Sequence, residues 1–270
     1  MHPLDIQWIY TLGSVVLVSC ASFLGMIALS LSPKRLSKVI PPLLSLAAGA
    51  LLGTALGHLL PESIEQVGSG RKLSILLLVG FVIFFAIEKA LVVWNSRSSG
   101  NGDFHHHHHQ PGLHSPEEEI RRDHGPVITN LLLGAAIHSS IDGMAMASAY
   151  CVNTHLGIIT TIAVLIHEAP HHIGDVSVLI HKGIPVMRAV LLSLLASAAS
   201  VIGALAVLFV GTQTVGLTTI LLPVTTANFL YIAACSLMPE LQHERGLRQS
   251  LAQLIFFVAG CSLVFLSKGE

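Results

Sequence analysis

The sequence predicts an all-α integral membrane protein with eight transmembrane helices. Apolar residues make up 52% of the chain and charged residues only 11%, a balance that water-soluble domains do not show. Several apolar runs are long enough to cross about 30 Å of hydrocarbon as helices. They lie at about residues 9–31, 41–60, 73–94, 127–150, 156–180, 186–210, 215–238 and 250–267. With 14 Lys+Arg against 15 Asp+Glu, the charge gives no indication of a nucleic-acid partner.

The first run has neither a basic leading segment nor a small-residue cleavage site, so it is predicted to be a span and not a removable signal. An even number of spans places both termini on one side. Most Lys and Arg residues lie in the loops of the other side. These basic residues are Lys34, Arg35, Lys38, Arg97, Arg121, Arg122, Lys182, Arg188, Arg245 and Arg248. Since basic loops stay in the cytoplasm, the termini are predicted outside or in a lumen. The membrane is a plasma, inner or organelle membrane.

Residues 1–94 comprise the first three spans, and residues 95–125 form a long loop on the predicted cytoplasmic side. The loop lacks apolar periodicity, so we expect it to be disordered. It contains the run His105, His106, His107, His108 and His109. Such a run is typical of a weak, mobile metal-binding segment.

A short sequence echo relates the two ends of the chain. His58-Leu59-Leu60-Pro61-Glu62 closes the second run, and Ser236-Leu237-Met238-Pro239-Glu240 closes the seventh. These runs are the middle members of spans 1–3 and 6–8, and they cross the membrane in opposite directions. This pattern predicts an inverted repeat, residues 1–94 and 181–270, around the two spans of residues 126–180. In such a 3+2+3 arrangement a substrate site lies near the midplane between the halves.

The fourth and fifth runs carry polar residues in their middles. His138 and Asp142 are spaced i, i+4, and Ser139 can reach Asp142 at i, i+3. His167 and His171 repeat the i, i+4 spacing. At about 100° per residue, one helix face within about 140° would carry His167, Glu168, His171, His172 and Asp175. The short connection between the runs makes the two helices antiparallel neighbours, so the two polar faces can meet.

Imidazole and carboxylate ligands without thiolate suit Zn²⁺, and Fe²⁺, Mn²⁺, Co²⁺ and Cd²⁺ are compatible. Asp142 and Glu168 together could neutralise a divalent ion in a low-dielectric site. The predicted ligands are His138, Ser139, Asp142, His167, Glu168 and His171. A further metal path is predicted through His172, Asp175, His58, Glu62, His155, His181, Glu240 and His243. Glu88 and Lys89 are interpreted as a self-compensating pair near the end of the third span.

These residues resemble the ZIP family of divalent-metal transporters over nearly the whole chain. The family motif HNxxDG of the fourth span is matched by His138, Asp142 and Gly143. The motif HExPHExGD of the fifth is matched by His167, Glu168, Pro170, His171, Gly174 and Asp175. The segments Gly57–Glu62 and Phe84–Lys89 resemble the ends of the family's second and third spans.

The resemblance implies an eight-span bundle, movement of metal into the cytoplasm, a binuclear site shared by spans 4 and 5, and a homodimer. The chain departs from the family pattern at two positions. Ser139 replaces an Asn, which exchanges an amide ligand for a weaker hydroxyl, and His172 replaces a Glu. We expect these departures to weaken binding at one of the two metal positions or to change the ion selectivity.

An intramembrane metalloprotease is the main alternative, because His167-Glu168-Ala169-Pro170-His171 also reads as HExxH. Pro170 argues against it, since a proline distorts the helix that must aim both histidines. A haem carrier with paired histidines is a weaker alternative, because it leaves Asp142 and Glu168 without a purpose.

Overall fold

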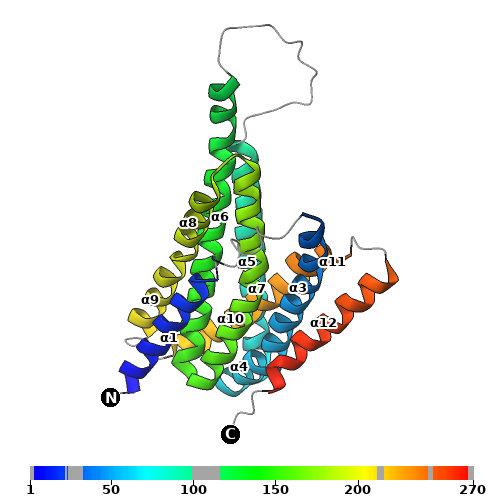
Figure 1. Ribbon diagram of the computed structural model, residues 1–270. Coiled ribbons are helices and arrows are strands. Elements are labelled where there is room, and N and C mark those ends of the chain that lie inside the picture. Colours follow the sequence, from blue (N-terminus) through cyan, green and yellow to red (C-terminus); the bar gives the residue numbers. More distant parts are fainter. Residues whose placement is uncertain are drawn as a thin grey trace.

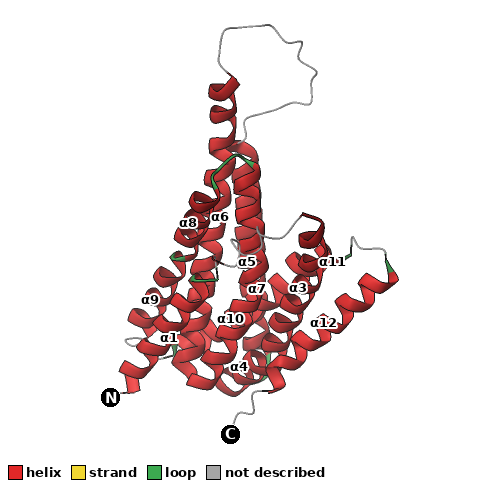
Figure 2. Ribbon diagram, viewed as in Figure 1, coloured by secondary structure: helices red, strands yellow, loops and turns green. Residues whose placement is uncertain are grey.

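Helices make up every regular element in the part of the chain that the structure describes (Figure 2). This computed structural model describes residues 3–21, 23, 33–98, 116–211, 216–242 and 246–266. The helices are α1 (Pro3–Ser19), α3 (Pro33–Thr54), η1 (Ala55–Leu59), α4 (Leu60–Val67), α5 (Arg71–Ser98), α6 (Pro116–Val152), α7 (Thr154–His181), α8 (Val186–Ser197), α9 (Ala199–Gly211), α10 (Leu217–Tyr231), η2 (Ile232–Leu237), α11 (Met238–Leu241) and α12 (Leu247–Leu266). The all-α prediction is confirmed.

Four helical segments within the described ranges have the length and composition of membrane spans. They are Lys38–Val67, Arg71–Ala90, Val186–Val210 and Thr219–Leu237, with mean hydropathies of 1.7 to 2.3. Large apolar side chains also cover outer surfaces, such as Leu78 and Val82 on α5 and Leu254 and Ile255 on α12. An exposed apolar surface of this kind fits contact with lipid. The polar residues in the middles of α6 and α7 lower the hydropathy of these two helices.

The segment predicted as a loop is partly helical. α5 continues to Ser98 and α6 begins at Pro116, so residues 116–125 belong to a helix and not to a disordered loop. The physical reason is a favourable helix start: proline fits the first helical position, and the glutamates at 117–119 lie at the positive end of the helix dipole. The predicted metal-binding run, residues 105–109, lies outside the described residues.

The long helices α6 and α7 run side by side through the middle of the bundle (Figure 1). α1, α8 and α9 flank them on one side, and α3 and α12 form the opposite edge. The start of α1 and the end of α12 lie at the same end of the bundle, and α6 begins at the other end (Figure 1).

Glycines allow two helix pairs to approach closely. A Cβ at Gly143 of α6 would collide with the backbone of Ser200 in α9, and one at Gly203 would collide with Ser140. A Cβ at Gly49 of α3 would likewise meet the backbone of Phe257 in α12. Membrane helices associate through such small residues, because lipid gives no hydrophobic drive between them. The contact between α6 and α9 fixes the helix that carries His138 and Asp142.

The sequence echo extends to the backbone. In each copy a π-helical segment, η1 or η2, ends two residues before the proline, Pro61 or Pro239. The amide of Leu60 bonds to Ala55 and that of Met238 to Ala233, both five residues back. A proline ring clashes with the carbonyl four residues before it, and a wider turn relieves this clash. The two segments thus share a structural feature that hydropathy does not reveal.

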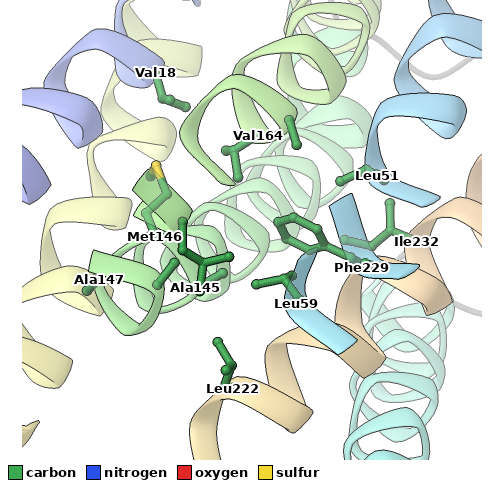
Figure 3. Close-up of a cluster of buried hydrophobic side chains, with 14 of the residues drawn as sticks. Val18, Leu51, Leu59, Ala145, Met146, Ala147, Val164, Leu222, Phe229 and Ile232 are labelled. Atoms are coloured by element: carbon green, nitrogen blue, oxygen red, sulfur yellow. The ribbon is translucent and has the colours of Figure 1, made fainter. Parts of the chain in front are cut away.

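The apolar core lies between α3, η1, α6, α7 and α10. Leu51, Leu59, Val164, Leu222 and Phe229 meet in it (Figure 3). Phe229 is fully buried, and its ring centroid lies 6.3 Å from that of His167. The core therefore packs directly against one side of the polar residues of α7.

Candidate metal site

The polar faces of α6 and α7 meet in one buried cluster. His138, Asp142, His167 and Glu168 each offer a ligand atom, and these atoms all lie within 4.8 Å of one another. Asp142, His167 and Glu168 are at most 2% exposed. The two i, i+4 half-sites predicted from the sequence are thus brought together.

The contact between His167 and Asp142 joins two groups that can both be metal ligands. His167 Nδ1 lies 3.1 Å from the carbonyl of Ala163. A carbonyl only accepts hydrogen bonds, so Nδ1 carries a proton, and Nε2 either has a lone pair or carries a second proton. This Nε2 lies 3.1 Å from Asp142 Oδ2, which is also an acceptor. Two acceptors at this distance need a cation or a second proton between them, and the spacing suits two ligands of one Zn²⁺ at about 2.0–2.1 Å each.

His138 belongs to the cluster, and the predicted ligand His171 lies beside it. His138 Nε2 lies 3.6 Å from Asp142 Oδ2 and 4.0 Å from Glu168 Oε1. The ring centroid of His171 lies 5.2 Å from that of His138 and 6.1 Å from that of His167, but His171 is not among the four residues whose ligand atoms lie within 4.8 Å of one another. Among the described residues, the buried atoms without a hydrogen-bond partner include Nε2 of His138, Nε2 of His171 and Oδ1 of Asp142. Each unpaired buried group costs about 1–3 kcal/mol, a cost that binding to an ion would remove.

Ser139 contacts the cluster through Glu168. Ser139 is 3% exposed, and its hydroxyl donates a hydrogen bond of 3.4 Å to Glu168 Oε1. Ser139 was predicted as a ligand, and its hydroxyl lies against the carboxylate of Glu168, another predicted ligand.

His172 holds the other oxygen of the same carboxylate. Its Nε2 lies 3.1 Å from Glu168 Oε2, and its Nδ1 lies 3.0 Å from Ser193 Oγ in α8. The serine can donate to Nδ1 while Nε2–H donates to the carboxylate, so a neutral ring satisfies both contacts. His172 therefore orients Glu168 through the oxygen that Ser139 does not contact. Hydrogen-bond partners of metal ligands commonly act in this way.

A cavity of about 140 Å³ adjoins the cluster, and its walls include His138, His171, Glu88 and Asn228. The apolar core, including Phe229, packs against His167, with the ring centroids of Phe229 and His167 6.3 Å apart. The cluster is thus bordered by a cavity and by apolar side chains.

The remaining predicted path residues lie outside the cluster. His58 and His155 are neighbours, with ring centroids 5.9 Å apart, about 18 Å along α7 from His167. Glu62 accepts a hydrogen bond of 3.2 Å from Gln66. Asp175, two helical turns after His167, is partly buried. The side chains of His181 and Glu240 and the whole of His243 lie outside the described part of the chain.

Two features of the cavity were missed or misread in the sequence. Asn228 of α10 is a single polar residue in an apolar run, and no spacing signal marks it. Glu88 was interpreted as the partner of Lys89, but it accepts a hydrogen bond from the hydroxyl of Tyr231 in α10. Lys89 instead lies 5.7 Å from the ring centroid of Phe85. Polar residues opposite one another on different helices cannot be paired from spacing alone.

Comparison with known proteins gives the family of this chain. The model of the ZIP zinc transporter family matches residues 5–126 and 123–268. Zinc transporter YKE4 of Saccharomyces cerevisiae is 27% identical over 252 residues, which cover 86% of this chain and 72% of that protein. Mouse zinc transporter ZIP4 is 30% identical over an alignment 298 positions long, which covers 91% of this chain and 45% of ZIP4. Zinc transporter ZIP13 of Pongo abelii is 31% identical over 238 residues, which cover 83% of this chain and 65% of that protein.

The family match spans nearly all of the chain, including both helices of the buried cluster. These relatives are transport proteins and not enzymes, so the metalloprotease alternative is not supported. By this match, the chain belongs to the ZIP zinc transporter family.

Proposed function

We propose that this protein moves a divalent transition-metal ion, Zn²⁺ in the first place, across a membrane through the cluster between α6 and α7. The observation that carries the proposal is the contact of His167 Nε2 with Asp142 Oδ2 at 3.1 Å, because both residues are candidate metal ligands and both are buried. The relatives named as zinc transporters support the choice of ion. Fe²⁺, Mn²⁺, Co²⁺ and Cd²⁺ are further candidates, because nitrogen and oxygen ligands accept them.

The charge of the site suits a divalent ion. Asp142 and Glu168 supply two negative charges when the imidazoles are neutral, so an ion of charge 2+ is balanced in the buried site. The resemblance further implies two adjacent metal positions. Glu168 can serve both, because one oxygen faces Ser139 and His138 and the other faces His172.

The proposed route begins at His58 and His155, passes the cluster and leaves by the cavity beside Glu88. The apolar core around Leu59 and Phe229 must part for an ion to reach the cluster from the first end. Transport would thus alternate between two arrangements, as in other secondary transporters.

The membrane arrangement is also part of the proposal. Eight spans in a 3+2+3 order are supported by the match between apolar runs and helices and by the paired π-helical segments. The basic loops support termini outside or in a lumen and a cytoplasmic His-rich loop, with metal moving into the cytoplasm. The family resemblance also leads us to propose that the protein assembles as a homodimer.

Reconstitution into liposomes tests the function. Liposomes that contain the full chain and a trapped zinc indicator should show saturable Zn²⁺ uptake down an imposed gradient. His167→Ala should abolish this uptake, because it removes a central ligand. The matched control is Glu65→Gln, which changes an exposed carboxylate of α4 outside the cluster. Equal uptake by empty liposomes, or by His167→Ala at equal protein incorporation, would contradict the proposal.

A further inference from the structure

Asn228 of α10 is a further polar side chain beside the cluster that has an atom without a hydrogen-bond partner. Asn228 of α10 is 2% exposed, and its Nδ2 is buried without a hydrogen-bond partner among the described residues. Buried amides in folded proteins nearly always have a partner. An unpaired one therefore marks a position where something outside the chain completes the bonding.

Asn228 lines the same cavity as His138 and His171. Nε2 of each histidine also has no hydrogen-bond partner within the described part of the chain, although that of His138 lies 3.6 Å from Asp142 Oδ2. Three side chains from α6, α7 and α10, each with a polar atom that makes no hydrogen bond, thus line one space. Its volume, about 140 Å³, holds an ion with a few waters, since one water occupies about 30 Å³ in the liquid.

Neighbouring contacts hold Asn228 in place. The next residue, Phe229, is fully buried and packs against the ring of His167, with centroids 6.3 Å apart. One turn further along, the Tyr231 hydroxyl donates to Glu88 of α5. α10 is therefore fixed relative to the helices that carry the other ligands.

An asparagine can present either end of its amide to the cavity. Rotation by 180° exchanges Nδ2 and Oδ1 within nearly the same volume. The oxygen has two lone pairs and is a metal ligand that hard ions prefer. In an apolar span, a ligand oxygen gives this buried amide a function that packing does not.

We propose that Asn228 is a further ligand of the transported ion, which it contacts from α10 through Oδ1. The proposal rests on the proposed function and deepens it, because the site then joins three helices and not two. A neutral oxygen ligand also favours harder ions such as Mn²⁺ over softer ones such as Cd²⁺. Asn228 would thus help to set the ion selectivity.

Metal binding to the purified full chain in detergent tests this assignment. Dissociation constants for Zn²⁺, Mn²⁺ and Cd²⁺ are measured by competition with a chelating dye, for wild type, Asn228→Ala and Asn228→Asp. We expect Asn228→Ala to weaken Zn²⁺ binding about 10-fold, on the scale of losing a partner of a metal site. The loss should be larger for Mn²⁺ than for Cd²⁺. Asn228→Asp should tighten Zn²⁺ binding, because a charged oxygen replaces a neutral one.

Thr226→Val is the matched control. It removes a fully buried hydroxyl two residues away on α10 that bonds to Leu222 and Ser63 and does not line the cavity. It should leave all three dissociation constants unchanged. Wild-type constants in both Asn228 variants would overturn the proposal, and so would equal weakening by Asn228→Ala, Asn228→Asp and Thr226→Val. Absence of Zn²⁺ flux in wild-type liposomes would instead refute the transport function, since the binding assay does not depend on flux.

Discussion

Asp142→Asn tests the electrostatics of the cluster most sharply, because it changes charge and almost no volume. It lowers the negative charge of the cluster from two to one when an ion of charge 2+ is bound. Breaking a buried ion pair by removing one partner costs about 3–5 kcal/mol. At about 1.4 kcal/mol for each factor of ten, Zn²⁺ should bind at least about 100-fold more weakly.

The metal-free protein should respond much less. The amide that replaces the Asp142 carboxylate can donate to or accept from His167 Nε2, so it can keep the contact of 3.1 Å. The thermal stability of the metal-free variant should therefore be close to that of the metal-free wild type. A purely structural role for Asp142 predicts a loss of stability instead.

Thermal unfolding with and without Zn²⁺ measures both effects. At a Zn²⁺ concentration of 100 times the wild-type dissociation constant, binding stabilises the wild type by about 2.7 kcal/mol. A 100-fold weaker variant gains only about 0.4 kcal/mol at the same concentration. Glu65→Gln, which changes an exposed carboxylate, should retain the wild-type gain. A full zinc-dependent gain in Asp142→Asn would refute a site balanced by two carboxylates.

Three further predictions follow from the same contacts. His172→Ala should weaken Zn²⁺ binding about 10- to 100-fold in a dye-competition assay, because Glu168 loses the partner that orients it; an unchanged constant would rule out that role. Gly143→Ala should reduce the yield of monodisperse protein in size-exclusion chromatography, since its Cβ meets the Ser200 backbone, whereas Gly174→Ala, with open space, should not; equal yields would contradict the proposed packing. Deletion of residues 101–113 should leave Zn²⁺ uptake into liposomes intact, and its loss would make the His-rich loop part of the transport path.

The sequence was most informative where one helix carries its own signal. Four of the apolar runs coincide with described segments that are long and apolar enough to cross a membrane, since hydropathy is a local property. The run at 186–210 forms two helices, α8 and α9, in place of one. The i, i+4 spacings of His138 with Asp142 and of His167 with His171 predicted two polar faces, and the short connection before Thr154 predicted that they meet. Each of these inferences needs only the geometry of one helix or one hairpin.

Other features depend on contacts between distant helices, and spacing gives no information on them. Asn228 and Tyr231 lie in an apolar run, and only the packing of α10 places them beside the cluster. The orienting role of His172 likewise depends on Ser193 of α8. The start of α6 at Pro116 was not predicted for a different reason. The segment is polar, which is typical of a loop, but a proline followed by glutamates also favours the first turn of a helix.

X-ray absorption at the zinc edge of the metal-loaded protein identifies the ligand atoms themselves. If the cluster between α6 and α7 binds the ion, we expect a nitrogen and oxygen shell at about 2.0–2.1 Å with imidazole scattering, no sulfur shell at about 2.3 Å, and weaker imidazole scattering in His167→Ala. A sulfur shell, or a spectrum that His167→Ala leaves unchanged, would contradict a metal site formed by these two helices.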